Sequence, residues 1–182
     1  WDRRLDQLIV RTSTRPLASG TISLTKAGLF LLVLGLIGLF VLIQLPQLAI
    51  YFGLAATPLV VLYPLAKRIT WFPQFVLGLT FSWGVFLGWA AVAESLPPSS
   101  ITFIYVGSVF WVFGYDTIYA IQDMEDDRTI GIKSSALAFN GAIRLGTGGA
   151  YLIAVILIAV GLFMLEHDGL PPAVLGWIGL AG

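Results

Sequence analysis

Five long apolar stretches, separated by short polar connections, constrain the fold of this chain more than any other feature of its sequence. They cover residues 27–45, 47–65, 74–93, 101–122 and 142–165. Each is close to the length of about 20 residues that an α-helix needs to cross a bilayer. Composition agrees, because 11% of the residues are charged where a soluble domain carries about 25%. We therefore expect an all-α, polytopic integral membrane helix bundle.

The two ends of the chain suggest a fragment. Residues 1–26 are polar and basic and lack the apolar core of a signal peptide. The apolar run over residues 170–182 is too short to cross a bilayer. We expect a single membrane domain over residues 1–182, truncated at both ends, with five complete spans and a truncated sixth.

Charge fixes the expected orientation. With five alternating spans, every Lys and Arg falls on one side, and the opposite connections QLPQ, ESLPPSS and EHDGLPP contain none. The positive-inside rule places the basic side in the cytoplasm of a bacterium, or in the matrix for a mitochondrial inner membrane. The expected surroundings are the lipid bilayer, with no nucleic-acid partner.

Carboxylates cluster at the end of the fourth apolar stretch. Asp116, Asp123 and Asp127 are spaced i, i+7 and i+11, so on a continuous helix they line one face. Asp116 lies deepest, and ionisable groups inside membrane spans are costly and usually functional. A second pair, Asp2 and Asp6, has i, i+4 spacing, which is also common on solvated helices.

Hard carboxylate oxygens without nearby Cys or His favour Mg²⁺ or Mn²⁺. The chain has no cysteine and one histidine. Mg²⁺ is usually held by one or two carboxylates together with substrate phosphates. Acidic pairs surrounded by basic residues therefore suit a diphosphate, and the apolar spans suit a lipid tail attached to it.

Three ordered motifs carry a resemblance to a known family. DTIYAIQDMEDDRTIGIKSSA resembles the second aspartate motif and the following Gly-x-Lys-Ser segment of the UbiA-type membrane prenyltransferases. WDRRLDQLIVRTSTRPLASG is similar to the end of the family's first motif, although the Asn-Asp that opens it would precede Trp1. YPLAKRITWFPQFVLGLTFSWG resembles the segment typical of members that prenylate 4-hydroxybenzoate in ubiquinone biosynthesis.

The resemblance implies a Mg²⁺-dependent transfer of a polyprenyl group from polyprenyl diphosphate to the ring carbon ortho to the hydroxyl of 4-hydroxybenzoate. The implied metal ligands are Asp2, Asp6, Asp123 and Asp127. Asp116 would orient the phenol or accept its proton, or would support the groups that do. Candidate substrate-binding residues are Arg11, Arg15, Tyr63, Lys67, Arg68, Tyr119 and Lys133. Among the basic residues, Arg68 is the first candidate for the carboxylate of the aromatic acid, and Arg11 and Arg15 taken by themselves fit topology signals better than ligands.

Other readings stay open at this stage. A family member with a haem, menaquinone, chlorophyll or homogentisate acceptor would keep the aspartates and change the acceptor pocket. A CDP-alcohol phosphotransferase also places a D-x-x-x-D pair on a membrane helix, but its D-G-x-x-A-R is absent from this sequence. A cation transporter would need acidic residues deep in several spans, and only Asp116 is clearly inside one.

Overall fold

The computed structural model describes residues 3–7 and 12–168, and within these ranges it contains helices and no strand. The helices, in chain order, are α1 (Arg3–Asp6), α2 (Leu24–Leu42), α3 (Gln47–Ile69), α4 (Pro73–Phe81), α5 (Gly84–Ala93), α6 (Ser99–Tyr119), η1 (Ala120–Asp123), α7 (Met124–Ile130), α8 (Ser135–Phe139), η2 (Asn140–Ala142) and α9 (Ile143–Asp168). The predicted all-α class is confirmed, and the predicted start of a sixth span lies outside the described residues.

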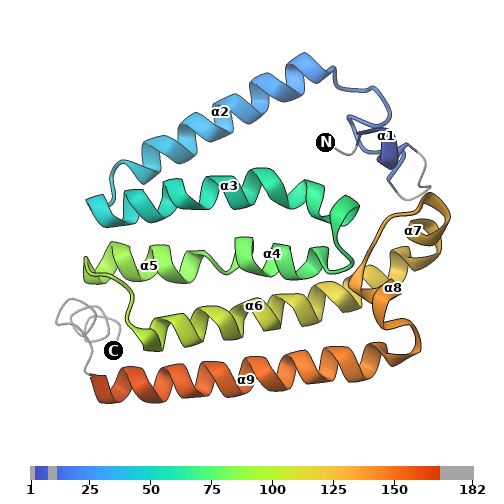
Figure 1. Ribbon diagram of the computed structural model, residues 1–182. Coiled ribbons are helices and arrows are strands. Elements are labelled where there is room, and N and C mark those ends of the chain that lie inside the picture. The colour runs from blue at the N-terminus through green and yellow to red at the C-terminus, as the bar shows by residue number, and fades with distance from the viewer. Residues whose placement is uncertain (1–2, 8–11, 169–182) are drawn as a thin grey trace, which may run out of the picture.

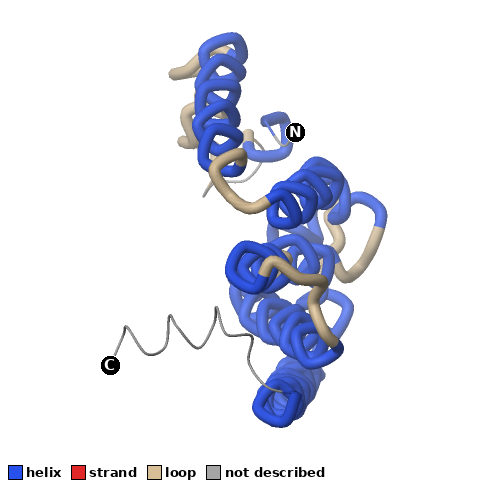
Figure 2. The backbone as a smooth tube through the Cα atoms, turned by 90° about the vertical axis from the view of Figure 1, so that its left-hand side faces the viewer, coloured by secondary structure: helices blue, strands red, loops and turns tan. Residues whose placement is uncertain are grey.

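The long helices from α3 to α9 lie side by side, each next to the one that follows it in the chain, whereas α2 approaches α3 near their connection and diverges from it toward the other end (Figures 1 and 2). The order across the molecule is α2, α3, the α4–α5 pair, α6 and α9. The short helices α1, α7 and α8 all lie at one end of this array (Figure 1). Neighbouring spans are antiparallel (Figure 1); the connection from α6 to α9 is the longest of the described ones and contains η1, α7, α8 and η2.

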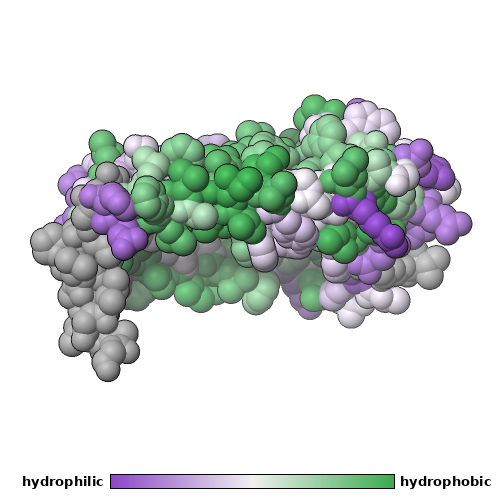
Figure 3. All heavy atoms as spheres, turned by 90° about the horizontal axis from the view of Figure 1, so that it is seen from below, coloured by the Kyte–Doolittle hydropathy of each residue, from purple (hydrophilic) through white to green (hydrophobic). Residues whose placement is uncertain are grey.

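In the part of the chain that the structure describes, five helical segments are long and apolar enough to cross a membrane: Leu24–Leu42, Gln47–Ile69, Pro73–Ala93, Ser99–Ile130 and Ser135–His167. A space-filling view shows an apolar band between more polar ends (Figure 3). Apolar side chains on the outside of α2, such as Phe30 and Leu31, are 65% and 71% exposed, as expected where lipid is the solvent. The chain is a multi-pass integral membrane protein, as predicted.

Helix α6 forms the centre of the packing and makes its most extensive contacts with α9. Two glycines permit this close approach. A Cβ on Gly107 would lie 2.7 Å from Ile158 Cγ1, and one on Gly161 would lie 2.7 Å from the backbone oxygen of Ser100. Because small residues let membrane helices pack closely, these glycines set the distance between the two helices.

The third predicted span is not one continuous helix. It is divided into α4 and α5 at Ser82 and Trp83. The Trp83 indole Nε1 donates a hydrogen bond to the backbone oxygen of Phe52 on α3 at 2.8 Å. The same indole contacts the rings of Phe86 and Tyr105. This tertiary contact stabilises the interruption between α4 and α5. The apolar pattern of the sequence alone does not predict the interruption.

The basic residues gather at one end, as predicted. Their segments are α1 and its following turn, the start of α2, the end of α3, the α7–α8 connection and the start of α9, all at the end that carries α7 and α8 (Figure 1). The first of the spans begins there with Ser23, whose side chain accepts a hydrogen bond from the Lys26 backbone N–H at 3.3 Å and caps α2. We therefore expect the functional site at the polar end of the bundle.

Candidate active site

The acidic stretch does not continue as one helix. Helix α6 ends at Tyr119, the 3₁₀ turn η1 covers Ala120–Asp123, and α7 then begins at Met124. A 3₁₀ helix has 3.0 residues per turn instead of 3.6, so it rotates Asp127 relative to Asp116. The continuous helix assumed in the prediction is therefore interrupted, and Asp116 and Asp127 line two different hollows.

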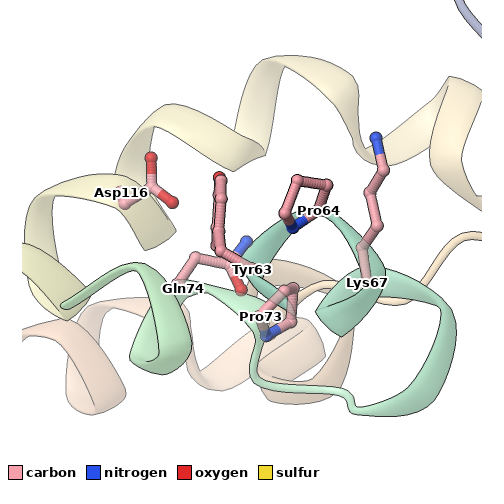
Figure 4. A pocket seen from close by; sticks show the side chains of 6 residues that line it. All are labelled: Tyr63, Pro64, Lys67, Pro73, Gln74 and Asp116. Carbon is pink, nitrogen blue, oxygen red and sulfur yellow. The ribbon is translucent and has the colours of Figure 1, made fainter. Parts of the chain in front are cut away.

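The first hollow, called here the Asp116 cavity, has a volume of about 180 Å³ and lies where three helices meet (Figure 4). Tyr63, Pro64 and Lys67 come from the end of α3, Pro73 and Gln74 from the start of α4, and Asp116 from α6. This volume is smaller than the 300–1,000 Å³ of sites for drug-sized ligands. It suits a small compound with a single ring.

Opposite charges stand at the two ends of the Asp116 cavity. Figure 4 shows the Asp116 carboxylate at one end and the Lys67 ammonium at the other, with Tyr63 between them and its hydroxyl on the Asp116 side. A ligand with a proton donor at one end and an anionic group at the other would match this arrangement.

The second hollow, called here the Lys133 hollow, has a volume of about 500 Å³. It is lined by Trp71, Asp127, Arg128, Gly131, Ile132, Lys133, Leu137, Ala138 and Asn140. Lys133 Nζ donates a hydrogen bond to the Ile69 backbone oxygen at 3.2 Å and lies 5.8 Å from the centre of the Trp71 ring. An ammonium group has three donors, so Lys133 is held in place while keeping donors for an anion.

A tight turn forms one edge of the Lys133 hollow. Gly131 ends α7 with a φ of 76°, in the left-handed region that glycine adopts without strain. Both its N–H and that of Ile132 donate to the backbone oxygen of Asp127, the latter at 2.9 Å. The turn thereby brings Lys133 back toward the Asp127 side of the hollow.

The two hollows share a wall. The Lys133 backbone N–H donates to the Lys67 backbone oxygen at 3.3 Å, and the Ser135 N–H donates to Gln74 Oε1 at 3.0 Å. The hydroxyls of Ser135 and Thr117 are 2.7 Å apart, and Thr117 also donates to the Phe113 backbone oxygen at 2.6 Å. These contacts join the loop before α8 to the α3–α4 connection and to α6.

The N-terminal candidates are described only in part. Asp2 and Arg11 lie outside the described residues. Asp6 Oδ1 forms an ion pair with Arg15 at 2.9 Å, so these two candidates contact each other and line neither hollow. Helix α1 lies at the same end of the molecule as α7 (Figure 1).

The donor set permits Mg²⁺ together with a phosphorylated ligand. Among the described residues, no group of three or more acidic or histidine side chains forms a ready-made metal site. Mg²⁺ is commonly held by one or two carboxylates plus substrate phosphates. Asp123 and Asp127 are half-buried, and Asp127 shares its hollow with the cations Arg128 and Lys133, which fits that mode of binding.

Other predicted residues take different places. Arg68 is exposed and lines neither hollow, and Tyr119 is 58% exposed. The sequence analysis did not single out Gln74, which is 5% exposed and lines the Asp116 cavity. The sequence does contain a sign that Gln74 matters, because it is a polar residue at the edge of an apolar span. A polar side chain there is costly to bury unless it is hydrogen-bonded, as was argued for Asp116.

The fold and the two hollows define a membrane protein with its polar site at one end of a helix array. The chain belongs to the UbiA prenyltransferase family, whose family model matches residues 1–182. A solved relative, titled "Apo structure of a UbiA homolog from Aeropyrum pernix K1", superposes with a TM-score of 0.75 at 27% identity, over 86% of this chain and 60% of that one.

Curated relatives are more similar in sequence. A mouse protein named "4-hydroxybenzoate polyprenyltransferase, mitochondrial" is 45% identical over 161 residues, which cover 87% of this chain and 43% of the mouse protein. The Caenorhabditis elegans protein of the same name is 48% identical over 139 residues, or 75% of this chain and 38% of that protein. The chain thus spans less than half the length of these relatives.

Proposed function

We propose that the protein of which this chain forms part transfers a polyprenyl group from polyprenyl diphosphate to 4-hydroxybenzoate, at the ring carbon ortho to the hydroxyl. The observation that carries the proposal is the Asp116 cavity, with a carboxylate at one end and an ammonium at the other. A hydroxybenzoate has the complementary pair of groups. The names of the curated relatives support the same acceptor.

The acceptor would lie with its phenol toward Asp116 and its carboxylate toward Lys67. Because Lys67 lines the cavity and Arg68 does not, we assign the aromatic carboxylate to Lys67 in preference to Arg68. Tyr63 would bound the ring between these two ends. A charge-assisted hydrogen bond from the ammonium is stronger than a neutral one, so it would select an acid over a neutral phenol.

The diphosphate would lie in the Lys133 hollow, beyond the shared wall. Lys133 and Arg128 would neutralise its oxygens. Asp123 and Asp127, with Asp2 and Asp6 from the N-terminal motif, would hold Mg²⁺, which when bound neutralises charge on the leaving diphosphate. Arg11, Arg15 and Tyr119 remain predicted substrate-binding residues on the same side of the membrane.

The reaction balances with these groups. The C–O bond between the prenyl C1 and the diphosphate breaks, and its electron pair leaves with the diphosphate oxygen. A new C–C bond forms between prenyl C1 and the ortho carbon, which then loses its proton to an oxygen of the released diphosphate so that the ring becomes aromatic again, and the phenolate oxygen finally takes its own proton back from the group that accepted it. Asp116 is the proposed acceptor for the phenol proton, and the apolar spans exclude water that would otherwise capture the prenyl cation.

The test is a transfer assay on the full-length protein in membranes, with radiolabelled polyprenyl diphosphate, Mg²⁺ and alternative acceptors. We expect turnover with 4-hydroxybenzoate and little with phenol, which lacks the carboxylate, or with homogentisate. Equal turnover of phenol and 4-hydroxybenzoate would overturn the acceptor assignment. Loss of turnover when a chelator removes Mg²⁺, and its return on adding Mg²⁺, would support the metal requirement.

A further inference from the structure

Gln74 is a buried amide at the point where the start of α4, the start of α8 and the cavity face of α6 meet. It is 5% exposed and lines the Asp116 cavity. A buried polar group is costly unless it is hydrogen-bonded, so we ask what the amide oxygen and the amide nitrogen each bind.

The amide oxygen of Gln74 accepts a hydrogen bond from the protein backbone. The Ser135 backbone N–H lies 3.0 Å from Gln74 Oε1, and an N–H can only donate. This contact therefore fixes which end of the amide is oxygen. Ser135 is itself held by the buried hydroxyl of Thr117, so the amide cannot easily turn over.

The nitrogen of the amide is consequently turned toward the cavity. Figure 4 shows it on the side of Tyr63, away from the oxygen. The Nε2 group thus faces a cavity that Asp116 also lines, so this cavity offers both a hydrogen-bond donor and an acceptor to a ligand.

A phenol oxygen satisfies both groups at once, because it donates its O–H to a carboxylate and accepts an N–H. A carboxylate would be repelled by Asp116. We propose, on the basis of the acceptor proposed above, that Gln74 Nε2 binds the phenol oxygen of the aromatic acceptor opposite Asp116. As the phenol proton moves to Asp116, the oxygen gains negative charge and the preorganised N–H stabilises it.

The test compares the binding of 4-hydroxybenzoate with that of benzoate, which lacks only the hydroxyl, to full-length protein without Mg²⁺ or prenyl diphosphate. Gln74→Glu keeps an oxygen for the Ser135 N–H and removes the donor. Its preference for 4-hydroxybenzoate over benzoate should fall by about 10-fold, as for the loss of one hydrogen bond. Gln47→Glu, on the exposed start of α3 at the opposite membrane face, makes the same chemical change and should keep the wild-type preference.

Three results would count against the role of Gln74 or its basis. An unchanged preference in Gln74→Glu refutes the role of Gln74 while leaving the acceptor assignment intact. A wild-type protein that binds neither ligand and transfers no prenyl group to 4-hydroxybenzoate refutes the acceptor assignment, and the role of Gln74 with it. If Gln74→Glu does not accumulate in membranes, Gln74→Met removes the same donor at similar length, and an unchanged preference in that variant is again a refutation.

Discussion

The Lys133 backbone N–H donates a hydrogen bond to the Lys67 backbone oxygen at 3.3 Å. Each of these lysines lines a different hollow, Lys67 with Asp116 and Lys133 with Asp127. The bond therefore joins the backbones that carry two cations on either side of one wall. If the two lysines bind the aromatic acid and the diphosphate as proposed, this bond would keep the backbones of the two anion-binding residues next to each other, which favours the orientation that such a reaction requires.

Neutralising the carboxylates near the Lys133 hollow should remove turnover. Asp123→Asn and Asp127→Asn should each lower the transfer rate by at least roughly 10²-fold, because a charged ligand for the leaving group's metal is lost. Glu125→Gln, an exposed position on α7, is the matched control and should keep its activity. A rate near the wild-type value in either Asp variant would show that this aspartate is an ordinary solvated surface residue and is not needed for turnover.

Substitutions of neighbouring cations distinguish two candidates for the aromatic carboxylate. Lys67→Met should raise the KM for 4-hydroxybenzoate by roughly 10- to 150-fold, the loss of a hydrogen bond to a charged group of about 1.5–3 kcal/mol. The KM for prenyl diphosphate should change much less. If Arg68→Ala produces this selective effect and Lys67→Met does not, the original Arg68 assignment holds instead.

Adding a methyl group at the α6–α9 contact should destabilise the fold. In Gly161→Ala the new Cβ would meet the Ser100 backbone oxygen at 2.7 Å, and backbone cannot move aside as a flexible side chain can. We expect a loss of about 1–3 kcal/mol, measured as a lower temperature of thermal unfolding in detergent. Gly148→Ala, on the same helix but facing open space, should be neutral or stabilising. Equal effects of the two variants would contradict the close packing.

The orientation of the spans can be read with single cysteines, because this chain contains none. In a cysteine-free background, Thr70→Cys after α3 should react only from the cytoplasmic or matrix side. Ser95→Cys after α5 should react only from the opposite side. Labelling of both positions from the same side would rule out the proposed arrangement of spans.

The array of spans and the end of the bundle that holds the basic residues and the site could be predicted from the sequence alone. The length of each apolar stretch must match the thickness of the bilayer. The distribution of Lys and Arg decides which ends of the spans stay on the cytoplasmic or matrix side during membrane insertion. The aspartate-rich stretch was also recognisable, since carboxylates next to an apolar span have few structural uses.

The grouping of side chains around the site was decided by tertiary structure. The spacing of Asp116 and Asp127 predicted one face, but the intervening 3₁₀ turn puts them in separate hollows. Lys67 and Arg68 are neighbours in sequence, and only the packing of α3 against α4 makes Lys67, and not Arg68, line the cavity. Gln74 gains its fixed orientation from Ser135, a residue of a distant segment. Hydropathy and charge are sums over local sequence, whereas a binding cavity depends on the rotation of each helix and on contacts between segments far apart in the chain.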